Sequence, residues 1–301
     1  MSFSSAVKDE LFLLDTKKKC CMLAELAGIA SFTLKITDTG GRFIVDSDRT
    51  GKRVSFLCKK VFGLKDGLLS PANTGRGGKC FSLYYEEKDA DIILKGLKKT
   101  NSALKADFEI SSEILKESCC VKSFVKGAFL GGGLMLEPEK TYHLEFVAKR
   151  AQAVEDLSSV LDFFDESPKI IKRQKYYVLY FKSFESIETV LNIIGAHKSL
   201  MEFMNIKIEK EEKNQINRMT NCEVANMQKT NDAASESIRD IEIIMTTIGL
   251  DAIDDQLQEM ALLRLANPDE SLAKLAVLSG LSRSGVNHRL KKISDIAREL
   301  R

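Results

Sequence analysis

The order of apolar and polar residues predicts the same series of elements twice. Segments 17–30 and 116–130 are rich in small and apolar residues and are predicted to be helices. Short runs that resemble strands follow each of them. The predicted strands are 32–36, 42–45, 80–86, 142–146 and 175–182, and the further helices are 51–63, 88–99, 152–165 and 184–195. The sequence pattern is weak for some strands, but the order α-β-β-α-β-β-α occurs in both halves and favours the α+β class.

A repeated sequence frame indicates that the two halves arose by duplication. Cys20-Cys21 is followed by Gly28, and Cys119-Cys120 is followed by Gly127 at the same offset, 99 positions later. A repeat of about a hundred residues is too long for a solenoid unit and indicates a duplicated domain. We therefore expect a first lobe at 1–103 and a second at 104–205. Small residues permit close helix packing, which predicts a lobe interface at Ala27, Gly28, Gly127, Ala128 and Gly131.

The amino-acid composition and the spacing of apolar residues change after residue 205. Residues 206–247 contain no Pro or Gly and have widely spaced apolar residues, which predicts a long, polar, exposed helix or helix pair. We expect a helical connector at 206–248 and a separate domain at 249–301. Three short helices are predicted in that domain, at 251–266, 270–279 and 282–299.

The last two of these helices have the pattern of a helix-turn-helix. Gly280 lies in the turn, where a left-handed residue is needed, and Ser282 is a good N-cap for the next helix. One stripe of that helix is apolar at helical spacing and is predicted to pack inward; it consists of Val286, Leu290, Ile293 and Ala297.

The opposite face is polar and basic, with Ser284 and Asn287 at its centre. Asn pairs with adenine and Arg or Lys with guanine, while Ser suits phosphates or base edges. Residues 281–301 carry a local charge of +4, against −4 for 251–275. The predicted DNA-binding residues are Ser282, Arg283, Ser284, Asn287, His288, Arg289, Lys291 and Lys292. The alternative is a three-helix cap whose basic face is only solvated.

A second basic cluster precedes the predicted strand at 175–182. It consists of Lys169, Lys172, Arg173 and Lys175. Lysines on an edge strand blunt pairing with other sheets, and the alternative is an auxiliary contact with phosphate groups.

Composition restricts the class of protein. A hydrophobic content of 44% and a charged content of 29% are typical of a soluble globular protein. There is no apolar run near the roughly 18 residues of a membrane span and no signal peptide pattern. The adjacent cysteines point in different directions on a helix and are expected to be reduced and buried, with no zinc spacing. We predict a cytoplasmic, nucleoid-associated protein with no cofactor and no metal.

The repeated frame resembles the LAGLIDADG motif of homing endonucleases. In that family two such helices pack together, and the eighth residue of each motif is a carboxylate that holds a divalent metal. The corresponding positions here are Thr33 and Gly132, neither of which is an anionic ligand. The resemblance therefore implies a body without catalytic residues and without nuclease activity. The runner-up is an endonuclease with alternative acids, for which the candidates are Asp38, Glu137 and Glu139.

The whole chain closely resembles the bacterial WhiA family. The resemblance rests on the double frame, on Asn217-Arg218, Asn221-Cys222-Glu223, Asn226 and Lys229 in the connector, and on the segment 281–290. It implies a degenerate LAGLIDADG body joined to a helix-turn-helix. The implied role is a transcriptional regulator linked to cell division, chromosome segregation or sporulation. Its expected partners are double-stranded DNA and RNA polymerase, a sigma factor or another regulator. A protein-interaction scaffold is the remaining alternative.

Overall fold

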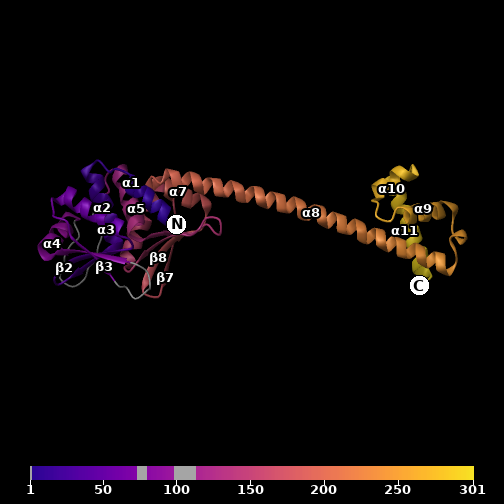
Figure 1. Ribbon diagram of the computed structural model, residues 1–301, viewed down its shortest axis with the longest axis horizontal. Helices are drawn as coiled ribbons and strands as arrows, with labels where there is room; N and C mark the ends of the chain where they lie inside the picture. The colour runs from indigo at the N-terminus through magenta and orange to yellow at the C-terminus, as the bar shows by residue number, and fades with distance from the viewer. Residues whose placement is uncertain (1, 73–79, 98–112) are drawn as a thin grey trace. The chain divides into compact units, whose positions relative to one another are not determined.

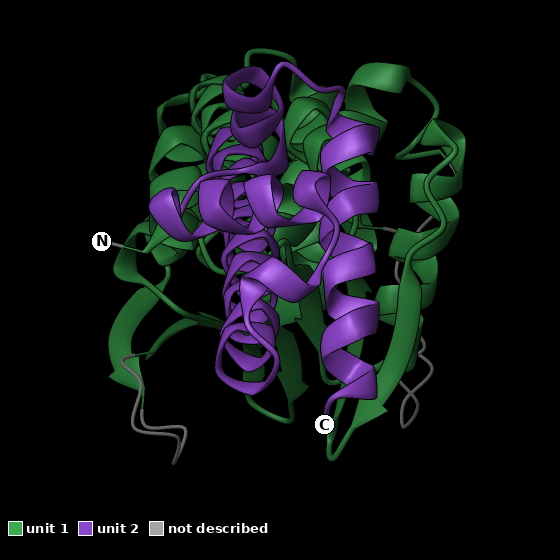
Figure 2. Ribbon diagram, turned by 90° about the vertical axis from the view of Figure 1, so that its right-hand side faces the viewer, with its two compact units in different colours: residues 1–210 green, residues 211–301 purple. Residues whose placement is uncertain are grey.

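The computed structural model describes residues 2–72, 80–97 and 113–301. The chain forms two compact units, residues 1–210 and residues 211–301 (Figure 2). The predicted boundary between the two lobes, at 103/104, lies outside the described residues.

The first unit contains the duplicated elements (Figure 1). The first copy runs α2 (Lys19–Thr33), β1 (Leu34–Thr37), β2 (Gly40–Val45), α3 (Asp48–Phe62), β3 (Leu68–Ala72), β4 (Cys80–Glu86) and α4 (Glu87–Gly96). The second copy runs α5 (Ser118–Gly132), β5 (Gly133–Met135), β6 (Leu144–Ala148), α6 (Ala151–Leu161), η1 (Asp162–Phe164), β7 (Lys169–Arg173), β8 (Tyr176–Phe181) and α7 (Phe184–Ile194). The predicted α+β order is confirmed in both copies.

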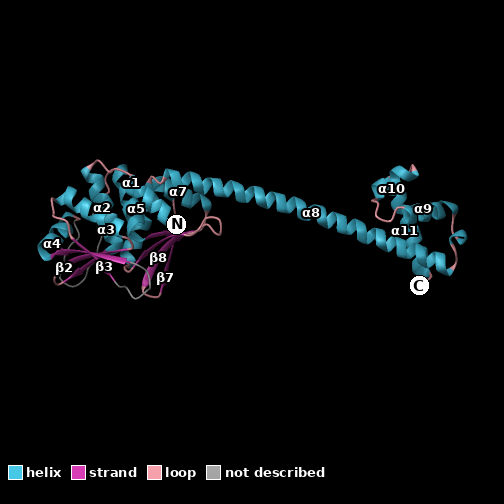
Figure 3. Cartoon of the chain, viewed as in Figure 1, coloured by secondary structure: helices cyan, strands magenta, loops and turns pink. Residues whose placement is uncertain are grey.

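Each copy contributes one antiparallel sheet of four strands. The strand orders are β1-β2-β4-β3 and β5-β6-β8-β7, so the same connectivity occurs in both sheets. The register pairs Phe43 with Leu83 in the first sheet and Phe146 with Leu179 in the second. All four of these side chains are buried. The helices lie on one side of the two sheets (Figure 3), so a single helical layer covers the apolar face of both.

The structure differs from the sequence predictions in several local elements, among them the short strands β3, β5 and β7, which were not placed. The helix α1 (Phe3–Leu13) was not predicted, although Phe3, Val7 and Leu11 have helical spacing and are buried. The predicted strand 32–36 is wrong at its start, because Phe32 and Thr33 are the last residues of α2. The Thr33 hydroxyl donates a hydrogen bond to the Ile29 carbonyl at 2.7 Å, a back-bond within the helix.

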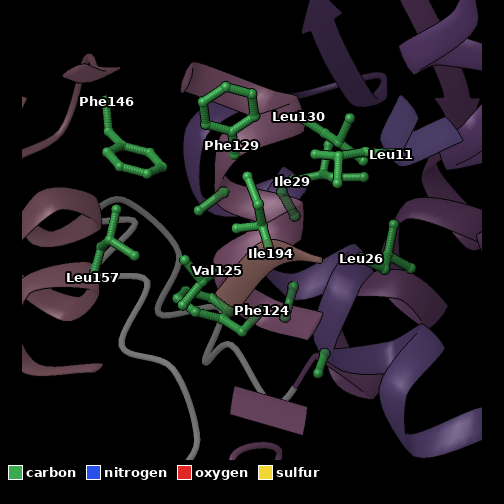
Figure 4. Close-up of a cluster of buried hydrophobic side chains, with 14 of the residues drawn as sticks. Leu11, Leu26, Ile29, Phe124, Val125, Phe129, Leu130, Phe146, Leu157 and Ile194 are labelled. Carbon is green, nitrogen blue, oxygen red and sulfur yellow. The ribbon is translucent and has the colours of Figure 1, made fainter. Parts of the chain in front are cut away.

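Helices α2 and α5 pack along each other in the centre of the unit. A Cβ atom at Gly28 would lie 2.2 Å from the carbonyl oxygen of Phe124, and one at Gly127 would lie 2.0 Å from that of Glu25. The two contacts are equivalent in the repeat, because Gly127 lies 99 positions after Gly28 and Phe124 lies 99 positions after Glu25. The helix backbones therefore touch at a pseudo-twofold axis. Figure 4 shows apolar side chains of both helices, including Leu26, Ile29 and Phe124, gathered in the buried cluster around this contact.

A buried ion pair network crosses the same helix pair. The carboxylate of Glu25 is fully buried and lies 2.8 Å from Arg53 Nε of α3 and 2.8 Å from Lys126 Nζ of α5. The Thr16 hydroxyl also donates to it at 2.8 Å. Burial alone would raise the pKa of Glu25, but the hydrogen bond from Arg53 and the charge of Lys126 outweigh it and lower the pKa.

The second unit is entirely helical. Helix α8 (His197–Thr247) begins in the first unit and continues into the second, and the elements that follow are η2 (Leu250–Ala252), α9 (Asp255–Ala266), α10 (Leu272–Ser279) and α11 (Arg283–Glu299). The core of this unit includes Ile241 and Ile244 of α8 together with residues of the three short helices. The last turns of α8 are therefore a structural part of this unit.

We predict that Gly127→Ala lowers the free energy of unfolding of the first unit by about 3 kcal/mol, the upper end of the usual range for overpacking. The added methyl group meets a backbone carbonyl, which cannot move without separating the two helices. Gly51→Ala in α3 is the matched control, since its Cβ would meet only side-chain atoms of Leu69, which can shift, and no backbone atom. That change is expected to remain within about 1 kcal/mol of the wild type in urea unfolding. Equal effects of both substitutions would contradict the backbone contact.

We predict that Glu25→Gln destabilises the first unit by about 3–5 kcal/mol at neutral pH, because Arg53 and Lys126 lose their buried counter-charge. The folded-state pKa of Glu25 is lowered, so its contribution is present above the ordinary pKa of about 4.3 and is lost as the pH falls through the folded-state value. The free energies of unfolding of the variant and the wild type are therefore expected to converge as the pH is lowered through the acidic range. Glu185→Gln, at an exposed pair with Lys207, is expected to change little at any pH.

Candidate nucleic-acid interface

The turn before α11 has the geometry that the sequence predicts. Gly280 has a left-handed backbone with φ of 68° and ends α10. Ser282 is the N-cap of α11, and its hydroxyl accepts a hydrogen bond from the Gly285 amide at 3.1 Å. The predicted turn and N-cap are confirmed. They set the direction in which α11 leaves α10.

The buried side of α11 is the predicted apolar stripe. Val286, Leu290, Ile293 and Ala297 are all buried. They belong to one cluster with residues from α8, α9 and α10, among them Ile244, Met260 and Leu275. Because this side of α11 is held in the core, the opposite side is presented to solvent.

The outward face of α11 carries the polar and basic side chains. At about 100° per residue, Ser284 and His288 lie opposite the buried stripe, and Asn287 lies nearer its edge than the sequence suggested. Asn287 and Lys291 also line a cavity of about 530 Å³ between α8, α10 and α11. The exposed members of the predicted set are Ser282, Arg283, Ser284, Asn287, His288, Lys291 and Lys292.

Arg289 differs from the rest of that set. It is half-buried and donates hydrogen bonds to the carbonyl oxygen of Gln256 at 3.4 Å and to its side-chain oxygen at 3.1 Å. The guanidinium therefore connects α11 to the start of α9. In this arrangement Arg289 orients α11, whereas Lys291 and Lys292 are exposed on the neighbouring turn.

Arg264 is a basic residue of this unit that the sequence did not single out. Its side chain is 2% exposed and donates to the carbonyl oxygen of Glu270 at 2.7 Å. Burial lowers its pKa. The hydrogen bond holds the loop between α9 and α10, so Arg264 supports the position of α10, which packs with α11 in the core of this unit. The only sign of this role in the sequence was the place of the arginine in the last turn of the helix predicted at 251–266.

In the first unit, the two positions of the missing acids lie at the ends of α2 and α5. Thr33 is buried and bonded to its own helix. A Cβ at Gly132 would lie 2.4 Å from the ring of Phe32 and 2.9 Å from the carbonyl oxygen of Val147. Phe32 therefore occupies the space that an acidic side chain at position 132 would need.

A cation from the second lobe lies against the end of α2. Arg150 donates to the carbonyl oxygen of Ser31 at 2.8 Å and to those of Ala30 and Leu34 at 3.4 Å. Burial lowers the pKa of Arg150 to about 10, and the charge of Asp156 acts in the opposite direction. At neutral pH the guanidinium is charged and satisfies the carbonyl groups that a helix leaves open at its end.

The alternative acids do not converge. Asp38 and Glu139 are exposed, and Glu137 accepts a hydrogen bond from the Phe3 amide at 3.1 Å. Among residues 2–72, 80–97 and 113–301, the only group of three or more His, Cys, Asp or Glu side chains that converges is formed by Cys20, Cys21, Cys119 and Cys120. The expectation that these adjacent thiols point apart is thus wrong, and the expected burial is wrong for Cys20, which is exposed at the helix start.

The face of the sheets away from the helices carries cations beside aromatic rings. Arg42 lies 5.3 Å from the ring centre of Tyr84, and Lys182 lies 5.4 Å from that of Tyr180. All residues of the edge strand β7 are exposed, and so is Lys175. The basic cluster predicted at 169–175 therefore lies on the edge of the second sheet and is open to solvent.

These features define a helix-turn-helix protein with a duplicated α+β body. The model of the WhiA LAGLIDADG-like domain matches residues 121–213, and that of the WhiA C-terminal helix-turn-helix domain matches residues 216–297. The chain is 36% identical to the probable cell division protein WhiA of Clostridium beijerinckii over 315 residues, covering 100% of this chain and 99% of that protein. It is 37% identical to the protein of the same description from Thermoanaerobacter over 318 residues, with 100% and 98% covered. The chain belongs to the WhiA family.

A solved structure has the same fold. The crystal structure of full-length WhiA from Thermatoga maritima matches with a TM-score of 0.60 at 24% identity and covers 99% of both chains. In the part of the chain that the structure describes, no helix has the length and apolar character needed to span a membrane.

Proposed function

We propose that the protein is a sequence-specific, double-stranded DNA-binding transcription regulator that acts at the nucleoid. The observation that carries this proposal is the exposed polar face of α11, fixed by the Ser282 cap on one end and the buried stripe behind it. A role in cell division, chromosome segregation or sporulation is supported by relatives described as probable cell division proteins. A contact with RNA polymerase or a sigma factor is part of the same proposal.

The roles along α11 follow from the chemistry of its side chains. Asn287, Ser284 and His288 are short polar groups in the first two turns and suit contacts with base edges. Lys291 and Lys292 are long exposed cations one turn later and suit phosphate groups. Ser282 and Arg283 lie at the helix start, where amide groups and a positive charge favour a phosphate.

We predict that Asn287→Ala lowers the preference for the cognate site by about 1–3 kcal/mol and leaves binding to random duplex nearly intact. Lys291→Ala is expected to weaken binding to all sequences and to reduce the salt slope by about one unit. Titrations of the full-length protein on selected and random duplexes at several salt concentrations measure both effects.

Arg298→Ala is the control, since it removes one exposed charge from the last turn of the same helix. A smaller change than that of Lys291→Ala is expected. If Asn287→Ala and Lys291→Ala left the cognate affinity unchanged, α11 would not be the reading helix, and the sheet face of the body would take its place.

We also propose that the protein has no nuclease activity. Support comes from the ends of α2 and α5, where Thr33 is bonded to its own helix, Phe32 fills the space beside Gly132, and Arg150 supplies a positive charge. A divalent metal needs carboxylate ligands, and a neighbouring guanidinium opposes its binding. The sheet face of the body then contributes at most contacts with phosphate groups, through the exposed cations of β7.

Plasmid DNA that carries the cognate site is expected to stay intact with the protein and Mg²⁺ or Mn²⁺. Gel electrophoresis of supercoiled, nicked and linear forms measures this. Glu137→Ala and Asp38→Ala distinguish true activity from a contaminant: cleavage by the wild type that either substitution abolishes would refute the proposal.

A further inference from the structure

Four cysteines from the two repeats meet at the start of the central helix pair. The sulfur atoms of Cys20, Cys21, Cys119 and Cys120 all lie within 4.8 Å of one another. Cys20 and Cys21 are in the first turn of α2, and Cys119 and Cys120 are in the first turn of α5. The pseudo-twofold axis that brings Gly28 beside α5 therefore also brings the two cysteine pairs together.

The thiols interact across the two helices, and Cys119 and Cys120 also share a hydrogen bond within α5. Hydrogen bonds join Cys21 to Cys119 and Cys120 to Cys20. Cys21 and Cys120 are buried, Cys119 is half-buried and Cys20 is exposed. The cluster is thus closed on its inner side by the helix pair and accessible from outside.

Four sulfur ligands at these distances match the ligand set of a structural zinc site. A tetrahedral site with Zn–S bonds of about 2.3 Å has sulfur atoms about 3.8 Å apart. The observed spacing comes within about 1 Å of that value, which small side-chain rotations can supply. We propose that Cys20, Cys21, Cys119 and Cys120 bind one divalent ion of the zinc class, held by two cysteines from each lobe.

The surroundings suit the charge of such a site. Four thiolates around one divalent cation leave a net negative charge. Lys17, Lys18 and Lys122 line a cavity of about 460 Å³ together with Cys21 and Cys119, against one acidic residue, Asp15, so net positive charge lies beside the sulfur atoms.

The two helix starts add a second reason. Neither Lys18 before α2 nor Glu117 before α5 provides a side-chain cap. The amide groups of the first turns are consequently not satisfied by a capping side chain, and they face the direction in which an anionic group is stabilised. Metal-bound thiolates in these turns supply that negative charge.

The ion would act as a clamp between the lobes. Because its ligands come from both repeats, binding free energy would add to the association of α2 with α5. It has no part in DNA cleavage or base reading, since the ends of α2 and α5 that carry Thr33 and Gly132 are the opposite ends of the same helices.

The test uses full-length protein purified with a phosphine reductant. Elemental analysis by plasma mass spectrometry is expected to find about one zinc per chain. Replacement by Co²⁺ is expected to give the intense visible bands of tetrahedral cobalt thiolate. The double variant Cys20→Ser/Cys119→Ser is expected to lose zinc affinity by more than about 100-fold, beyond what loss of an outer contact causes. If the double variant does not fold, the single variant Cys20→Ser, which changes an exposed side chain, takes its place in the measurement of zinc affinity.

Cys80→Ser/Cys222→Ser is the matched control, because it removes two cysteines outside the cluster. It is expected to keep both the zinc and the cobalt spectrum. The proposal is overturned if the reduced wild type binds no metal in stoichiometric amount, or if the cluster variants bind as well as the control. A further outcome would also overturn it. If the protein isolated without reductant has a mass lower by four hydrogen atoms, the four cysteines form two disulfides; if it then binds no metal after reduction, the cluster is a disulfide pair and not a metal site.

Discussion

The backbone contact between α2 and α5 is the constraint on which the first unit depends. Gly28 and Gly127 leave no room for a side chain, and each faces a carbonyl group of the other helix. Helices in such close contact cannot slide without steric clash, so the position of each sheet relative to the other is determined. The same contact places Glu25 beside Lys126 and brings the four cysteines together.

The packing around Thr33 and Gly132 fits the absence of acidic residues at these two positions. Close packing at the ends of α2 and α5 puts Phe32 against Gly132, which removes the space for an acid. Arg150 then satisfies the carbonyl groups at the end of α2. Restoring a carboxylate at one position would not rebuild a metal site, because the aromatic ring and the guanidinium would remain. This part of the body is a packed lobe junction.

Most of the fold follows from local patterns, and the long-range contacts do not. The duplicated order of elements and the helix-turn-helix were predictable because apolar spacing, Gly280 and Ser282 act within a few residues of each other. Arg150 and the cysteine cluster were not, because each acts through partners distant in the sequence. Arg264 was missed although its partner Glu270 is near in the sequence, because helix spacing does not show that its side chain is buried. Arg289 was assigned to DNA from its charge, while the structure shows a hydrogen bond to Gln256 that no spacing along the helix reveals. Helix periodicity gives the direction of a side chain but not its partner.

The Glu25–Lys126 pair makes the two lobes unlike partners. The position equivalent to Glu25 in the second frame is Phe124, and the position equivalent to Lys126 in the first is Ala27. If two first lobes from different chains paired, each would bury a carboxylate with no lysine from the opposing helix; two second lobes would bury lysines without a carboxylate. The duplicated halves are therefore matched to each other and mismatched to themselves. This asymmetry favours intramolecular pairing over exchange of lobes between chains.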